Sequence, residues 1–161
     1  MVTKLDNNAV SMAGEFYAMS RLFLEGYEAA LTLGRAKGVD ILVYNPRNSK
    51  QFKVEVKTTK TLKNESLFDG ANLHWLLNVK HETPDTGLIF CFVYTDLKVS
   101  PKTYRLFFVP ARRVANYCKW EHQHWLTAYH KKPVKDSEMR VFRVKAIGDT
   151  NGYEDNFAIF E

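Results

Sequence analysis

The sequence contains few of the residues that mark disulfide-rich, zinc-binding or membrane proteins. Its 161 residues include 2 cysteines, Cys91 and Cys118, and neither belongs to a paired metal or redox motif. We therefore expect two reduced, buried thiols in place of a disulfide framework. The longest apolar run, residues 87–94, is too short to cross a bilayer, and residues 1–16 have no apolar signal core. A cytoplasmic protein without membrane contact is expected.

Several enzyme classes are disfavoured because their motifs are missing. There is no GxSxG nucleophile elbow and no P-loop, which argues against the corresponding hydrolases and NTPases. His122 and His124 stand close together, but without a nearby cysteine or a zincin pattern they do not favour a zinc site. No repeat or linker-like segment divides the chain, so residues 1–161 are interpreted as a single domain.

Acidic residues are scarce in two stretches of a chain whose net charge is +5. Residues 98–135 contain nine Lys or Arg against Glu121 alone, and residues 47–63 contain six against Glu55 alone. This imbalance favours a polyanionic partner such as nucleic acid, although a merely solvated surface is an equal alternative on charge alone. The tryptophans of the first stretch are expected to pack in the core, so the contact with nucleic acid is assigned to lysines.

Hydrophobic periodicity predicts an α/β (α+β) fold with a central mixed β-sheet flanked by helices. Strands are expected over residues 27–33, 39–44, 51–59, 88–95, 104–109 and 139–144. Helices are expected over residues 8–25, 72–79 and 110–120. The first helix has an apolar stripe that is expected to be buried, which consists of Met12, Phe16, Met19 and Phe23.

Charged and apolar side chains alternate through residues 51–59. Val54 and Val56 fall on one face of the predicted strand, whereas Glu55 and Lys57 fall on the other. The charged face is either the solvated side of an ordinary strand or a pair of groups that are placed for chemistry.

Asp40 belongs to the preceding strand, which contains no other charge. A turn-rich segment joins the two strands as a hairpin, and facing residues of an antiparallel pair lie about 5 Å apart. Asp40 and Glu55 therefore converge, and two carboxylates repel unless a divalent cation lies between them. Glu15 flanks the stripe of the first helix and can add a third carboxylate, while Gly14 beside it permits close approach of another backbone. Taken singly, each acid has an ordinary explanation: Glu15 flanks a helix stripe, Asp40 is a turn residue and Glu55 forms a surface pair across strands. Taken together, their order and spacing favour one site.

These residues resemble the PD-(D/E)XK nuclease superfamily, which has the restriction-endonuclease-like fold. The matching elements are Glu15 on the first helix, the GVD that ends at Asp40 and the EVK of residues 55–57. The resemblance covers residues 14–59 in motif and the later strand–strand–helix order in outline, with Val39 where the family name has proline. It implies a core of αβββαβ-type order.

The resemblance also implies a function and a role for each residue. Asp40, Glu55 and the carbonyl of Val56 would hold Mg²⁺, for which Mn²⁺ can substitute, and Glu15 would support the metal through water. Lys57 would orient the attacking water and offset developing charge. The expected protein is a DNA endonuclease, and a homodimer would supply one site for each strand. The alternatives are an inactive nucleic-acid-binding module on the same fold and an interaction protein whose charges are structural.

Basic residues near this motif and in the stretch 98–135 are expected to contact nucleic acid. They are Arg35, Lys37, Lys60, Arg112 and Arg113. Arg35 and Lys37 belong to the loop before Asp40, where exposed loop charges are an equal alternative.

Overall fold

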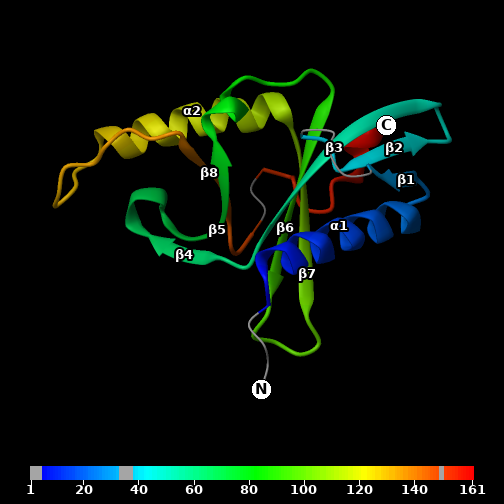
Figure 1. The fold of residues 1–161 in the computed structure, drawn as a ribbon, viewed down its shortest axis with the longest axis horizontal. Coiled ribbons are helices and arrows are strands. Elements are labelled where there is room, and N and C mark those ends of the chain that lie inside the picture. The colour runs from blue at the N-terminus through cyan, green and yellow to red at the C-terminus, as the bar shows by residue number, and fades with distance from the viewer. Residues whose placement is uncertain (1–4, 33–37, 149–150) are drawn as a thin grey trace.

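The computed structural model describes residues 5–32, 38–148 and 151–161 of the chain. The elements in chain order are α1 (Asn7–Leu24), β1 (Glu28–Leu31), β2 (Ile41–Asn45), β3 (Lys50–Thr59), β4 (Leu62–Glu65), η1 (Ser66–Phe68), β5 (Gly70–Asn78), η2 (Val79–Glu82), β6 (Leu88–Asp96), β7 (Thr103–Pro110), α2 (Ala111–Thr127), β8 (Met139–Lys145) and η3 (Phe157–Phe160). Figure 1 shows the larger sheet at the right, the smaller sheet at the left, and the two long helices above and below. None of the helices in these ranges is long and apolar enough to cross a membrane.

The larger sheet has five strands in the order β1-β2-β3-β6-β7. The pairs β1–β2, β2–β3 and β6–β7 are antiparallel, whereas β3 and β6 are parallel. This arrangement confirms the expected mixed sheet flanked by helices. The central strand β6 is buried on both faces, which explains its continuous apolar sequence.

The connection between β3 and the parallel strand β6 contains β4 and β5, which form the smaller sheet together with β8 in the order β4-β5-β8. The helix predicted over residues 72–79 is therefore wrong, because these residues belong to β5. Leu73, Trp75 and Leu77 point into the core with the period of a strand, and β5 pairs with both β4 and β8. An αβββαβ order would place a helix between β3 and the next strand of the larger sheet, β6. In this chain β4 and β5 occupy that position, and the second long helix, α2, follows β7.

The larger sheet is covered on both faces. On one face, α1 and η3 pack against the apolar side of β3, with Ala18, Leu22 and Phe160 fully buried. On the other face, α2 and the smaller sheet bury the opposite side of β6 and β7. Phe92 of β6 stacks on Phe142 of β8 with ring centroids 4.3 Å apart. The two cysteines lie in these two layers as buried free thiols, as expected.

The stripe of α1 that faces the sheet differs from the prediction. Val10, Gly14, Ala18 and Leu22 are the buried residues of the helix. Most of the bulkier predicted stripe points outward: Met12, Phe16 and Phe23 are 44%, 50% and 51% exposed, whereas Met19 is partly buried against the core. The reason is the close approach of α1 to β3, because a Cβ built on Gly14 would lie 1.9 Å from Thr58 Oγ1. The small side chains on this face of α1 permit the close approach to β3. The approach brings Glu15 to the end of β3, in agreement with the expectation that Gly14 lets another backbone come near.

Candidate nuclease site

The candidate site lies where the pairing of β3 with β2 stops, at Ile41, while β3 continues with only β6 paired beside it. Pairing between these strands extends from Asn45 to Ile41, so Asp40 lies just before β2, where the prediction had put it inside the strand. The backbone N–H of Asp40 donates to Val54 O at 2.8 Å. Beyond this point the edge of β3 is no longer covered by β2, and this edge is where the acidic side chains gather.

Val56 orients the Asp40 carboxylate. The Val56 N–H donates to Asp40 Oδ2 at 2.7 Å, a bond that becomes available because β2 has ended. In an extended strand the N–H and C=O of one residue point toward the same neighbouring strand. The carbonyl of Val56 is therefore directed to the same edge as the Asp40 carboxylate.

Glu55 and Lys57 lie on the face of β3 opposite Val54 and Val56, as the alternation predicted. Lys57 Nζ is 2.7 Å from Glu55 Oε1, and the Glu55 side chain is 4% exposed. Burial by itself would raise the pKa of Glu55, but the neighbouring His81 and Lys57 side chains outweigh it. The net pKa of Glu55 is lowered, so this carboxylate is ionised at neutral pH.

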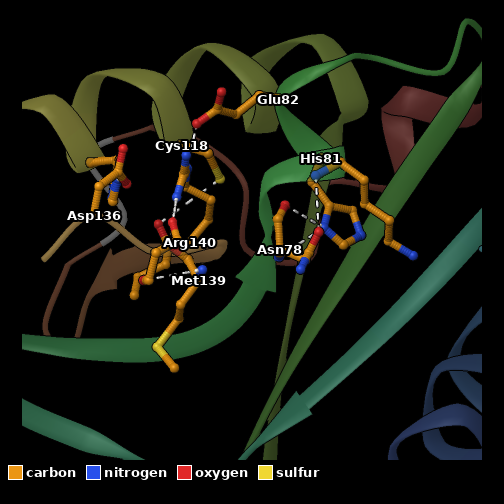
Figure 2. A network of polar contacts seen from close by, with 11 residues as sticks. Asn78, His81, Glu82, Cys118, Asp136, Met139 and Arg140 are labelled. Atoms are coloured by element: carbon orange, nitrogen blue, oxygen red, sulfur yellow. Dashed lines mark hydrogen bonds and ion pairs between the residues drawn. The ribbon is translucent and has the colours of Figure 1, made fainter.

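His81 is a neighbour of Glu55 that the sequence motif did not include. Its Nε2 is 3.5 Å from Glu55 Oε1, and its side chain is 9% exposed. The ring is held by η2, where the Asn78 N–H donates to His81 Nδ1 at 3.1 Å, a contact visible in Figure 2. Nδ1 is also 3.0 Å from Asn78 O, and Nε2, which has no hydrogen-bond partner among the described residues, is the ring nitrogen that faces Glu55. The N-x-x-H spacing of a capping box at a strand end was the available signal, but only the fold brings η2 to β3.

Glu15 and Asp40 are electrostatically coupled across the gap between α1 and β3. Burial raises the pKa of Glu15, the negative charge of Asp40 raises it further, and Lys57 opposes both. Burial also raises the pKa of Asp40, against the Val56 N–H and the charge of Lys57, while Glu55 adds to the rise. The structure thus brings Glu15, Asp40, Glu55 and Lys57 together, with three carboxyl groups around one ammonium.

The oxygen donors at this edge fit a hard divalent cation. Asp40, Glu55 and the Val56 carbonyl supply oxygens without sulfur or an obligatory imidazole, which suits Mg²⁺. A cation would also offset the burial and the mutual repulsion that raise the pKa of Asp40 and Glu15. Within the described ranges, no group of three or more Asp, Glu, His or Cys side chains is already gathered closely enough to hold a metal by side chains alone. The fit therefore requires the backbone carbonyl and water ligands.

The basic residues predicted to contact nucleic acid are not all at one place. Arg35 and Lys37 lie outside the described residues. Lys60 lines a hollow next to Lys57. Arg112 and Arg113, at the first turn of α2, line a separate hollow of about 380 Å³. Their roles stay predictions, but only Lys60 lies in a hollow that also contains a residue of the candidate site.

Two further expectations concern α2. Trp120 is 55% exposed, so the expected core packing is wrong for this side chain, which projects from the outer face of the helix. Its ring stacks on His124 with centroids 5.3 Å apart. His122 Nε2 is 2.7 Å from Asp136 Oδ1. The two histidines thus have separate partners, in agreement with the absence of a zinc pattern.

Comparison with known proteins supports the fold. No protein-family model and no curated protein sequence matches this chain. Among solved structures, the bacterial homing endonuclease I-Ssp6803I is similar to it, with a TM-score of 0.54 and 10% sequence identity. The match covers 97% of this chain and 91% of that chain. At this identity the likeness is one of fold, and it shows that this chain has a nuclease-like fold over nearly its whole length.

Proposed function

We propose that this protein is a Mg²⁺-dependent nuclease that hydrolyses phosphodiester bonds of nucleic acid, with DNA cut internally as the substrate. One observation supports it above the others: Asp40, Glu55 and Lys57 converge on the uncovered edge of β3, and Glu15 reaches the same point from α1. The order and types of these residues resemble the PD-(D/E)XK motif. The fold likeness to a homing endonuclease agrees with this reading.

Each residue has a distinct task in the proposed reaction. Asp40, Glu55 and the Val56 carbonyl would hold Mg²⁺, which would supply charge neutralisation at the scissile phosphate and lower the pKa of a bound water. Lys57, anchored by Glu55 in the free protein, turns toward the attacking water and offsets the charge that develops in the transition state. Glu15, whose pKa is raised by burial and by Asp40, would accept a hydrogen bond from a water ligand of the metal.

The second candidate is an inactive nucleic-acid-binding module on the same fold. The basic hollow at Lys60 favours it, because that surface needs no catalysis in order to bind a polyanion. The complete set of four site residues favours the nuclease.

Cleavage assays distinguish the two candidates. Plasmid and oligonucleotide DNA are incubated with Mg²⁺ or Mn²⁺ and wild type, Lys57→Ala, Asp40→Asn or Lys53→Ala. Lys53→Ala is the matched control, because Lys53 is on the same face of β3 but pairs with Asp85 at 3.0 Å. We expect wild type and the control to cleave, and Lys57→Ala to lose about a hundredfold or more in rate with the metal still bound. Asp40→Asn should weaken metal binding itself.

Two outcomes would change the conclusion. If Lys57→Ala cleaves as fast as wild type, Lys57 is a surface lysine and the proposed mechanism is wrong. If wild type binds DNA but cleaves nothing with either metal, the binding module replaces the nuclease.

A further inference from the structure

A hollow of about 420 Å³ adjoins the candidate site at Lys57. Its walls are the first turns of α1, the end of β3, the start of β4 and the middle of β5. We call it the β3-end groove. The chain leads into it directly from the site, because Lys57, Lys60 and Lys63 follow one another along its lining.

The lining of the β3-end groove contains two lysines, Lys60 and Lys63, in addition to Lys57, which is paired with Glu55. Lys60 and Lys63 are exposed and form no ion pair with any described residue. None of the described residues that line the groove has a carboxylate side chain. Other basic residues of the protein do have acidic partners, such as Arg47 with Glu161 at 2.7 Å. The N-terminal end of α1, at Asn7, is capped by the Asp6 carboxylate, which accepts the Asn8 N–H, so the attraction for an anion comes from the lysines. The groove therefore attracts an anion with several charges in a row.

His74 gives the groove a polar wall that lacks a protein partner. This side chain of β5 is 6% exposed, and neither ring nitrogen has a hydrogen-bond partner within the described structure. Burial lowers the pKa of His74 to about 4, and the charges of Lys63 and Arg143 act in the same direction. The ring is thus neutral at pH 7, with one nitrogen able to donate and one able to accept. Unpartnered buried polar groups are costly, which indicates a site that a ligand completes.

The size of the groove selects one strand over a duplex. A sphere with the volume of the groove is about 9 Å across. A DNA duplex is wider than its own major groove, which is about 12 Å wide, so a whole duplex does not fit inside the hollow. The aromatic residue of its lining, Trp75, is buried and donates its indole N–H to Val93 O, so it is not free to stack on a base. Contacts in the groove therefore go to phosphates, which carry no sequence information.

We infer that the β3-end groove binds the phosphodiester backbone of one nucleic-acid strand as it leads away from the phosphate to be cut. The position of that phosphate, beside Lys57, rests on the proposed function. The groove makes the contact independent of sequence, and it favours substrates in which one strand separates from its complement near the site.

The first test measures binding without cleavage. A fluorescein-labelled single-stranded oligonucleotide is titrated in EDTA over a series of salt concentrations, with wild type and Lys60→Gln/Lys63→Gln. The control is Lys131→Gln/Lys132→Gln, which removes two exposed lysines of the segment after α2 that line none of the hollows described above. Each phosphate contact with a single strand contributes about 0.7 to the slope of log K against log salt, so the groove variant should lose about 1.4. The control should lose less. An unchanged slope in the groove variant, or equal losses in both variants, overturns the inference.

The second test locates the strand. Because Cys91 and Cys118 are buried, a thiol introduced by Lys63→Cys can be labelled selectively with a photocrosslinker. We expect it to crosslink to the single strand, and Lys132→Cys to do so far less; equal yields would overturn the inference. Failure of the groove is distinguishable from failure of the nuclease. If wild type cleaves but the groove lysines do not affect binding, the groove is refuted and the nuclease stands. If strand binding depends on the groove but nothing is ever cleaved, the groove stands and the nuclease is refuted.

Discussion

Gly14→Ala tests the contact that positions Glu15. An added Cβ would lie 1.9 Å from Thr58 Oγ1 and 3.0 Å from the Thr58 Cβ and Cγ2, which no stable structure accommodates without movement. Helix propensity alone favours alanine over glycine by about 1 kcal/mol, whereas overpacking of this kind costs about 1–3 kcal/mol. The severity of the contact puts the cost at the upper end, so we expect a net loss of about 1–2 kcal/mol in the free energy of unfolding.

Thr58→Ala supplies the matched rescue. It removes the hydroxyl and methyl that collide with the new Cβ, and no hydrogen bond is lost, since Thr58 Oγ1 has no partner in the described structure. The double variant should therefore recover about 1 kcal/mol as a coupling energy. Ser20→Ala, on the exposed side of α1, reports the effect of propensity alone.

Urea denaturation of the four variants and wild type measures these differences. Gly14→Ala should also slow cleavage, because α1 must move away from β3 and takes Glu15 with it. A Gly14→Ala protein that is about 1 kcal/mol more stable than wild type, as propensity alone requires, would refute the packing argument.

Three further predictions concern the site and its assembly. His81→Ala should raise the Mn²⁺ concentration needed for half-maximal cleavage severalfold, because it removes the ring whose Nε2 lies 3.5 Å from the Glu55 carboxylate and leaves that carboxylate less well fixed. His81→Gln, which keeps a polar N–H near Glu55, should retain most of the affinity. Equal behaviour of the two variants would show that this contact is unimportant. Without metal at pH 7, Asp40→Asn should be more stable than wild type, because the raised pKa of Asp40 means that its ionised carboxylate destabilises the fold. This difference in stability should disappear as the pH falls through the raised pKa of Asp40 to the ordinary pKa of Asp. Thermal denaturation of both proteins across this pH range measures it. The homodimer stays a prediction, and the exposed apolar face of α1 is its candidate interface. Phe16→Glu should therefore yield monomers in sedimentation. A wild-type protein that sediments as a monomer with and without DNA would contradict the homodimer.

Local patterns in the sequence determined most strands and part of the site. The alternation in residues 51–59 assigned Glu55 and Lys57 to one face of β3 because side-chain direction in a strand depends only on parity. The apolar run at β6 likewise predicted a strand that is buried on both sides. The hairpin of β2 and β3 required nothing beyond two β-rich runs and a turn between them.

Only the tertiary structure decided which helix face is buried, what residues 72–79 form and what surrounds Glu55. The outward-facing stripe of α1 is the more hydrophobic by side-chain size, but the small residues Gly14 and Ala18 permit contact with β3 at the shorter distance. Residues 72–79 became β5 because β4 and β8 pair with them. His81 reaches Glu55, and Lys63 and His74 share a groove with Lys57, through a crossover that joins segments distant in the chain. Propensity acts between neighbours in sequence, whereas these contacts depend on which surfaces pack together, and that choice is made by the whole fold.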